Sequence, residues 1–166
     1  MKFIADIFTN PAILVPIFAW MSAQILKTLI NFCVTHEFKF ERLIGDGGMP
    51  SGHSATVMSL AVFCGLAYGF QSIYFGITAI LAIIVMHDAM GVRREAGKHA
   101  VQIKHIAEII NGMFTGETEH IRTEKLKEFI GHTPLQVIFG ALLGFIVALV
   151  YTLVAGIPYM GFAPTV

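Results

Sequence analysis

The sequence predicts an all-α membrane protein, a polytopic helix bundle with about four transmembrane helices plus an amphipathic cytoplasmic helix. Hydrophobic residues make up 55% of the 166 residues and charged residues 13%, half of the roughly one quarter that is usual in soluble domains. The mean hydropathy is +0.72. Several long apolar segments approach the roughly 20 residues that cross a bilayer. The length suits one integral membrane domain, residues 1–166.

Four segments are predicted to span the membrane. They are approximately residues 11–34, 54–70, 72–90 and 134–155. Two pairs of small residues, Gly65 with Gly69 and Gly140 with Gly144, are spaced for close packing between helices in lipid. The polar segment 91–133 separates the last two spans. In it, residues recur at helical spacing on one apolar face: Ala96, Ala100, Ile103, Ala107 and Ile110. This pattern predicts an amphipathic helix on the membrane surface or under the bundle.

Basic residues gather in the loops 35–53 and 91–133, which four spans place on one side. The two loops contain nine of the 11 Lys and Arg residues. Cytoplasmic loops carry an excess of such residues, so the pattern predicts a multi-pass protein of the cell membrane with both polar loops in the cytoplasm. The 11 acidic residues balance the 11 basic ones, and this balance does not indicate nucleic acid as a partner.

Metal and disulfide chemistry are poorly supported. Cys33 and Cys64 both lie in apolar runs, which indicates neither a disulfide framework nor a cysteine-based zinc site. His99 and His105 are six residues apart and therefore lack the spacing of a helical zinc pair. We therefore expect no metal and no cofactor.

The first span contains a polar stripe formed by Gln24, Lys27 and Asn31, at positions i, i+3 and i+7. A lysine inside a membrane is costly and by default indicates a functional site. Alternatively, Lys27 extends along the helix to the membrane surface. Because that alternative does not explain why Gln24 and Asn31 share its face, a site is the favoured interpretation.

A glycine-rich segment, residues 47–55, precedes the second span. The first turn of the helix that follows offers unpaired backbone N–H groups, which suit a phosphate. His53 in that turn can donate a proton near neutral pH. The alternative is an ordinary helix start in which Ser51 or Ser54 is the N-cap and His53 has no role.

The last span opens with a predicted capping box. Thr133 is the expected N-cap, Pro134 occupies the first helical position, and Gln136 stands at the third. His132 is thereby held just ahead of a second helix start. We expect it on the same side of the membrane as His53.

The two histidines share that side with charged residues near the end of the third span. Arg93 and Arg94 can stabilise phosphate charge. Asp88 could orient an imidazole or pair with an arginine, and a purely structural ion pair is an equal alternative. Together with His53 and His132, these residues suit phosphoryl transfer.

The motifs resemble those of the type-2 phosphatidic acid phosphatase and vanadium haloperoxidase superfamily. Pro50-Ser51-Gly52-His53 is similar to its central motif, and residues 131–144 resemble its third motif. The fuller set resembles the divergent branch of that superfamily, across about residues 15–150. That set comprises residues 47–55, 87–93, 96–98 and 131–135.

The resemblance implies a role for each matching position. His132 would be the nucleophile that forms a phosphohistidine, and His53 would be the acid that protonates the leaving group. Ser51 and the amide of Gly52 would hold phosphate oxygens, and Lys27 would be the lysine of the first motif. The expected partner in the bilayer is a lipid phosphate or diphosphate.

The sequence departs from the superfamily pattern at three positions. Val34 stands where the first motif has arginine, and Leu126 stands where an arginine precedes the third-motif histidine. Gln136 replaces an aspartate that would stabilise the imidazole cation. Residues elsewhere would then supply the missing charges: Arg42, Arg93 or Arg94, and Asp88.

Three functions follow as hypotheses. The favoured one is a metal-independent phosphatase acting on phosphatidic acid, phosphatidylglycerophosphate or a polyprenyl diphosphate. The second is a protein that binds or transports anionic lipid headgroups without catalysis, and the third is a vanadate-dependent peroxidase. A bundle of this size has little room to enclose a site alone, which leaves a homodimer open.

Overall fold

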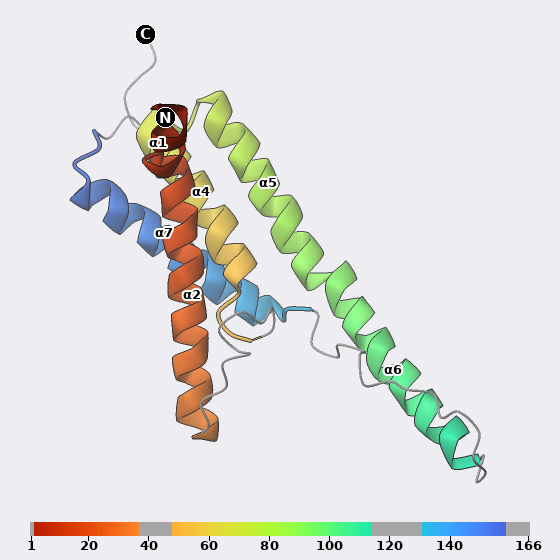
Figure 1. The fold of residues 1–166 in the computed structure, drawn as a ribbon. Coiled ribbons are helices and arrows are strands. Elements are labelled where there is room, and N and C mark those ends of the chain that lie inside the picture. The colour runs from red at the N-terminus through yellow and green to blue at the C-terminus, as the bar shows by residue number, and fades with distance from the viewer. Residues whose placement is uncertain (1, 37–47, 114–130, 159–166) are drawn as a thin grey trace.

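The computed structural model describes residues 2–36, 48–113 and 131–158. This part of the chain is helical and contains no strand, so the predicted all-α class is confirmed (Figure 1). The helices are α1 (Lys2–Phe8), α2 (Pro11–Thr35), α4 (Gly52–Tyr68), α5 (Ile73–Met90), α6 (Val92–Met113) and α7 (Pro134–Val154).

The four apolar helices begin at polar residues. The N-caps of α2, α4, α5 and α7 are Asn10, Ser51, Ser72 and Thr133, and each side chain accepts a backbone N–H of the first turn. Such caps matter in an apolar bundle because unpaired N–H groups cost free energy there. The observed bounds of these four helices lie within two residues of the bounds predicted from the sequence.

Length and composition identify the parts that can cross a membrane. Among the described residues, three helical stretches qualify: α2, α7 and the stretch Ile73–Met113, which joins α5 and α6. Helix α4 has 17 residues, about 26 Å of axial length, slightly below the roughly 30 Å of a bilayer core. Apolar side chains on the outside, such as Ile77 and Ile84 of α5, are about three-fifths exposed, as expected of lipid-facing residues.

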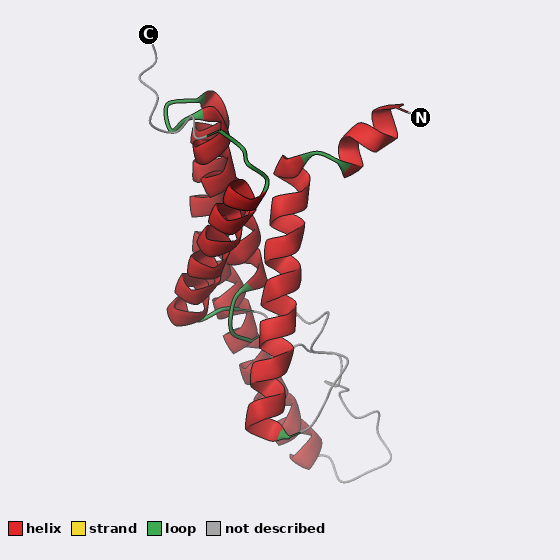
Figure 2. Ribbon diagram, turned by 90° about the vertical axis from the view of Figure 1, so that its left-hand side faces the viewer, coloured by secondary structure: helices red, strands yellow, loops and turns green. Residues whose placement is uncertain are grey.

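Helix α4 lies between α2 and α5 in the bundle (Figure 1), and Figure 2 draws helices and loops but no strand among the described residues. Helices α2, α5 and α7 all pack on α4, and α2 also packs on α7. Within the described residues, α2 and α5 flank α4 and their backbones do not approach each other closely. Buried residues of α4 are mostly small near its start, with Ser54, Ala55 and Ser59 fully enclosed, while Phe63 fills the space further along.

Glycines bring α4 and α7 close together, as the sequence predicts for Gly140 and Gly144. A Cβ on Gly140 would collide with the Ser51 carbonyl oxygen, and one on Gly144 would collide with the Ala55 carbonyl oxygen. The other predicted pair differs. A Cβ on Gly65 would lie 2.5 Å from the Phe70 ring, so this glycine makes room for an aromatic side chain.

Gly69 of that second pair lies beyond the end of α4 and takes a φ of 91° as its C-cap. Glycine is favoured at this backbone angle because it has no Cβ to clash. Its role is therefore to turn the chain, and the prediction that it packs between helices is wrong.

Helix α6 continues in the direction of α5 and projects away from the other helices (Figure 1). Its predicted placement on the membrane surface or under the bundle stays a prediction. Only Gly91 separates α5 from α6, and its carbonyl accepts the Glu95 N–H at 3.1 Å, which restarts the helical hydrogen bonds at once. The amphipathic pattern itself is present, with Ala100 and Ala107 buried and Ile103 half exposed.

Candidate functional site

Backbone hydrogen bonds hold the starts of α4 and α7 together. The Ser51 N–H donates to the Gln136 carbonyl at 3.0 Å, which joins the N-cap of α4 to the first turn of α7. The His132 N–H donates to the Ala89 carbonyl at 3.0 Å, which fixes the same region to the end of α5. Three helix ends therefore converge at one place.

The two histidines singled out from the sequence meet at this place. Their ring centroids, on His53 and His132, lie 5.9 Å apart with the ring planes at 60°. His53 is the second residue of α4, and His132 precedes the N-cap of α7. The His132 side chain is only 2% exposed. Their convergence agrees with the geometry expected from the sequence.

The predicted capping box of α7 is present and also orients His132. The Gln136 Oε1 atom accepts the Thr133 N–H at 3.0 Å and lies 3.3 Å from the His132 Nδ1 atom. Because a backbone N–H is only a donor, the amide atom that faces it must be oxygen. That oxygen can only accept, so the contact requires a proton on Nδ1 and is compatible with the neutral ring whose lone pair is on Nε2.

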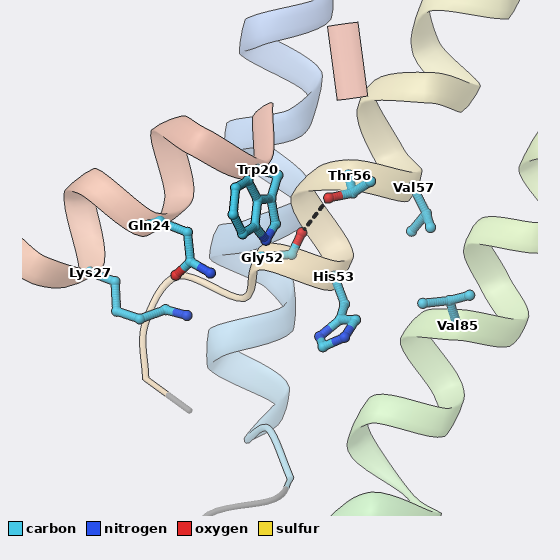
Figure 3. Close-up of a pocket in the computed structure, with 8 residues that line it drawn as sticks. All are labelled: Trp20, Gln24, Lys27, Gly52, His53, Thr56, Val57 and Val85. Atoms are coloured by element: carbon cyan, nitrogen blue, oxygen red, sulfur yellow. Dashed lines mark hydrogen bonds between the residues drawn. The ribbon is translucent and has the colours of Figure 1, made fainter. Parts of the chain in front are cut away.

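A cavity of about 270 Å³ opens beside His53 (Figure 3). Helices α2 and α4 supply most of its wall and α5 supplies one residue. The lining residues are Trp20, Gln24, Lys27, Gly52, His53, Thr56, Val57 and Val85. Helices α2 and α4 run in opposite directions (Figure 1). Lys27 therefore lies beside Gly48 in the loop before α4, and Trp20 lies beside Gly52 at the start of α4.

Lys27 is buried in the wall of this cavity. Its side chain is 4% exposed, and it lies eight residues, about 12 Å along the axis, before the end of α2 at Thr35. The loop before α4 packs on its stem, since a Cβ on Gly48 would lie 3.1 Å from the Lys27 Cγ atom. Figure 3 shows its ammonium on the His53 side. This position favours a site residue over a lysine that extends to the surface.

The polar stripe of α2 divides between two environments. Gln24 lines the cavity and is 5% exposed. Its Oε1 atom is buried and has no hydrogen-bond donor within the described part of the chain. Asn31 does not line the cavity and instead donates to the Thr35 Oγ1 atom at 3.4 Å.

The glycine-rich motif before α4 was interpreted from the sequence either as a phosphate site or as an ordinary helix start, and the structure has features of both. The Ser51 side chain is fully buried and caps α4, accepting the Ser54 N–H at 3.4 Å and the Ser54 hydroxyl at 3.1 Å. Gly52 lines the cavity, where a Cβ would lie 3.4 Å from the Trp20 ring. Ser51 is thus a helix cap, and a contact of Ser51 with phosphate stays a prediction.

The predicted charged residues are not gathered in this cavity. Arg94 is exposed on α6 and its backbone packs against Gly131. Arg93 belongs to the first turn of α6, and Arg42 lies outside the described residues. Asp88 is half-buried beside Ala89, whose carbonyl binds the His132 backbone. Lys27 is the cation that lines the cavity among the residues that the structure describes.

Three lining residues were missed by the sequence reasoning. Thr56 and Val57 follow His53 by three and four residues on the same face of α4, so helical spacing could have identified them. Val85 comes from α5 and could be found only from the packing of that helix on α4. Across the described ranges, no group of three or more His, Cys, Asp or Glu residues is placed to hold a metal ion.

Fold and site together define a helical membrane protein in which two histidines meet at converging helix starts. Residues 8–147 match the family model described as the divergent PAP2 family, and the chain belongs to this family. It is 37% identical over 151 residues to YuiD, an uncharacterized membrane protein of Bacillus subtilis strain 168. That alignment covers 87% of this chain and 96% of YuiD. No solved structure matches the chain.

Proposed function

We propose that the protein is a metal-independent phosphatase that releases phosphate from a membrane lipid phosphate or diphosphate. The observation that carries this proposal is the 5.9 Å separation of the His53 and His132 rings. Two hydrogen bonds that share one phosphate oxygen span about 6 Å, so one phosphate can contact both rings. Membership of the divergent PAP2 family supports the same chemistry.

In the first step, the lone pair on the His132 Nε2 atom attacks phosphorus. A nitrogen–phosphorus bond forms and the bond from phosphorus to the lipid oxygen breaks. Protonated His53 gives its proton to that oxygen, so a lipid alcohol leaves, or a lipid phosphate when a diphosphate is cleaved. The hydrogen bond that Nδ1 can donate to the Gln136 Oε1 atom supports this role because, in the neutral ring, it places the lone pair on Nε2.

In the second step, water attacks the phosphohistidine. His53, now neutral, takes a proton from that water while the nitrogen–phosphorus bond breaks. Inorganic phosphate is released and both histidines return to their starting protonation states.

The wall of the cavity supports binding of a phosphate. Lys27 supplies positive charge, and the unpaired N–H groups of the first turn of α4 favour an anion. The apolar lining residues Trp20, Val57 and Val85 suit the first carbons of a lipid. A lipid with its phosphate between His53 and Lys27 would place its first carbons against these apolar side chains.

A phosphate-release screen tests this function. Purified protein in detergent micelles is offered phosphatidic acid, phosphatidylglycerophosphate and a polyprenyl diphosphate, with the His132→Ala variant as the control. We expect release from at least one lipid, inhibition by orthovanadate, which mimics five-coordinate phosphorus, and no inhibition by EDTA. Inhibition by EDTA, or equal release by the variant, would contradict the mechanism.

A second function, binding or transport of anionic lipid headgroups without hydrolysis, is favoured by one observation. The partner of the His132 imidazole is Gln136, a neutral amide, which orients the ring but supplies no charge to stabilise an imidazole cation. Saturable binding of a lipid phosphate, with no phosphate released from any lipid of the screen, would select this function.

A further inference from the structure

The Gln24 side chain lines the cavity and carries a buried amide oxygen that has no hydrogen-bond donor among the described residues. The residue is 95% buried. A buried amide oxygen without a donor costs free energy, and such groups call for a specific explanation. Gln24 lines the cavity beside Lys27 (Figure 3), so a turn of its amide would bring the oxygen to a ligand in the cavity.

The chemistry of an amide restricts what that ligand can be. Ionised phosphate oxygens only accept hydrogen bonds, so they can pair with the Gln24 amide nitrogen but never with its oxygen. A hydroxyl group both donates and accepts. The terminal torsion of glutamine is broad and roughly two-fold, so rotation about it can turn either amide atom toward the cavity.

We propose that Gln24 binds a hydroxyl group that the substrate carries next to its phosphoester. The preferred substrates are then glycerol-type lipid phosphates with a free hydroxyl, and hydroxyl-free polyprenyl phosphates are poorer ones. This inference rests on the proposed function for the position of the phosphate at His53 and Lys27. It adds a residue that determines specificity through the headgroup.

The size and lining of the cavity fit such a headgroup. Its volume of about 270 Å³ is just below the 300–1,000 Å³ that is usual for sites enclosing drug-sized ligands. It can therefore enclose a phosphate with a short polyol but not the acyl chains. Gln24 lies one helical turn from Lys27 on the same face of α2, toward Trp20, where a group one or two carbons beyond the phosphate would lie.

A pair of lipids that differ in one hydroxyl tests the inference. The first is 1-acyl-glycerol 3-phosphate, which has a free 2-hydroxyl, and the second is its 2-deoxy analogue. For the natural sequence, we expect kcat/KM to be about fivefold to tenfold higher for the hydroxyl lipid, the value of one neutral hydrogen bond. In Gln24→Leu this preference should disappear, because leucine offers no partner.

Two further variants complete the experiment. Gln24→Met preserves the unbranched shape of the side chain and should behave like Gln24→Leu, which guards against a failure specific to leucine. Asn31→Leu changes the same polar stripe of α2 outside the cavity and should keep the full preference for the hydroxyl lipid. All variants are first checked for a single symmetric peak in detergent gel filtration.

A loss of activity in Gln24→Leu that is equal for the two lipids would overturn the inference, since the amide would then contact the phosphate itself. Equal kcat/KM for both lipids in the natural sequence would overturn it as well. Binding is measured separately by the fluorescence of Trp20, the one tryptophan of the sequence, which lines the cavity. If no lipid is hydrolysed, the proposed function fails, and the affinities of the two lipids still decide the role of Gln24.

Discussion

Gly140 of α7 lies against the backbone carbonyl of Ser51, the N-cap of α4, with no space for a Cβ between them. One turn later, Gly144 lies in the same way against Ala55. These contacts set the distance between the starts of two helices, and thereby help to set the distance between His53 and His132. Residues without any chemical function of their own therefore determine the geometry of the site.

Gly140→Ala should destabilise the protein and reduce phosphate release. The added methyl group forces α7 away from α4, and overpacking of this kind costs about 1–3 kcal/mol. A lower midpoint of thermal unfolding in detergent would measure the effect. Gly76→Ala on α5 is the matched control, since a Cβ there meets nothing within 4 Å. An unchanged midpoint in Gly140→Ala would show that the two helices can separate without cost.

His132→Ala should abolish phosphate release while the protein remains folded. Removing the attacking atom of a covalent mechanism costs at least about a thousandfold in kcat. The loss is measured as phosphate released under single-turnover conditions. His99→Ala, an exposed histidine of α6, should retain normal activity. Full activity in His132→Ala would exclude the phosphohistidine.

Gln136→Glu should raise kcat and move the acid limb of the pH–rate profile to higher pH. The carboxylate keeps the capping box and favours the protonated form of His132, so the neutral nucleophile appears only at higher pH. An opposite charge at this distance shifts titration by about one pH unit or more. Measuring kcat/KM across pH 5–9 tests the sign. A shift to lower pH would contradict the contact between Gln136 and the imidazole.

Lys27→Met should weaken binding of lipid phosphate about tenfold or more, because a charge-assisted hydrogen bond to phosphate is lost. The change appears mainly in KM and in the titration of Trp20 fluorescence. Lys98→Met is the control, since Lys98 is exposed on α6 and pairs with Glu95 at 2.6 Å. Equal affinities for Lys27→Met and the natural sequence would remove Lys27 from the site.

Cys33 provides a test of the predicted orientation. It is exposed two residues before the end of α2, at the same end of the bundle as the site, whereas Cys64 is buried. In intact cells, we expect a membrane-permeant maleimide to label Cys33 and an impermeant one to leave it unlabelled. The Cys33→Ser variant gives the background. Labelling by the impermeant reagent would place the site outside the cytoplasm.

Much of the fold could be predicted because its causes are local. Apolar length and N-cap chemistry, as at Thr133 and Gln136, act within a few residues, so the bounds of α2, α4, α5 and α7 followed from the sequence. The meeting of His53 and His132 was also within reach, because each stands at a helix start and both starts were predicted on one side of the membrane.

The cavity and the direction of α6 could not be predicted from local patterns, because they depend on packing between distant segments. The sequence placed Gln24, Lys27 and Asn31 on one stripe. Only the packing of α4 against α2 makes Gln24 and Lys27 part of the cavity wall, whereas Asn31 lies outside the cavity and donates a hydrogen bond to Thr35. The contribution of Val85 and the direction of α6 depend in the same way on tertiary structure. The order of the residues in this chain determines its helices and where they start. The shape of the site depends on how helices that are far apart in the sequence pack against one another.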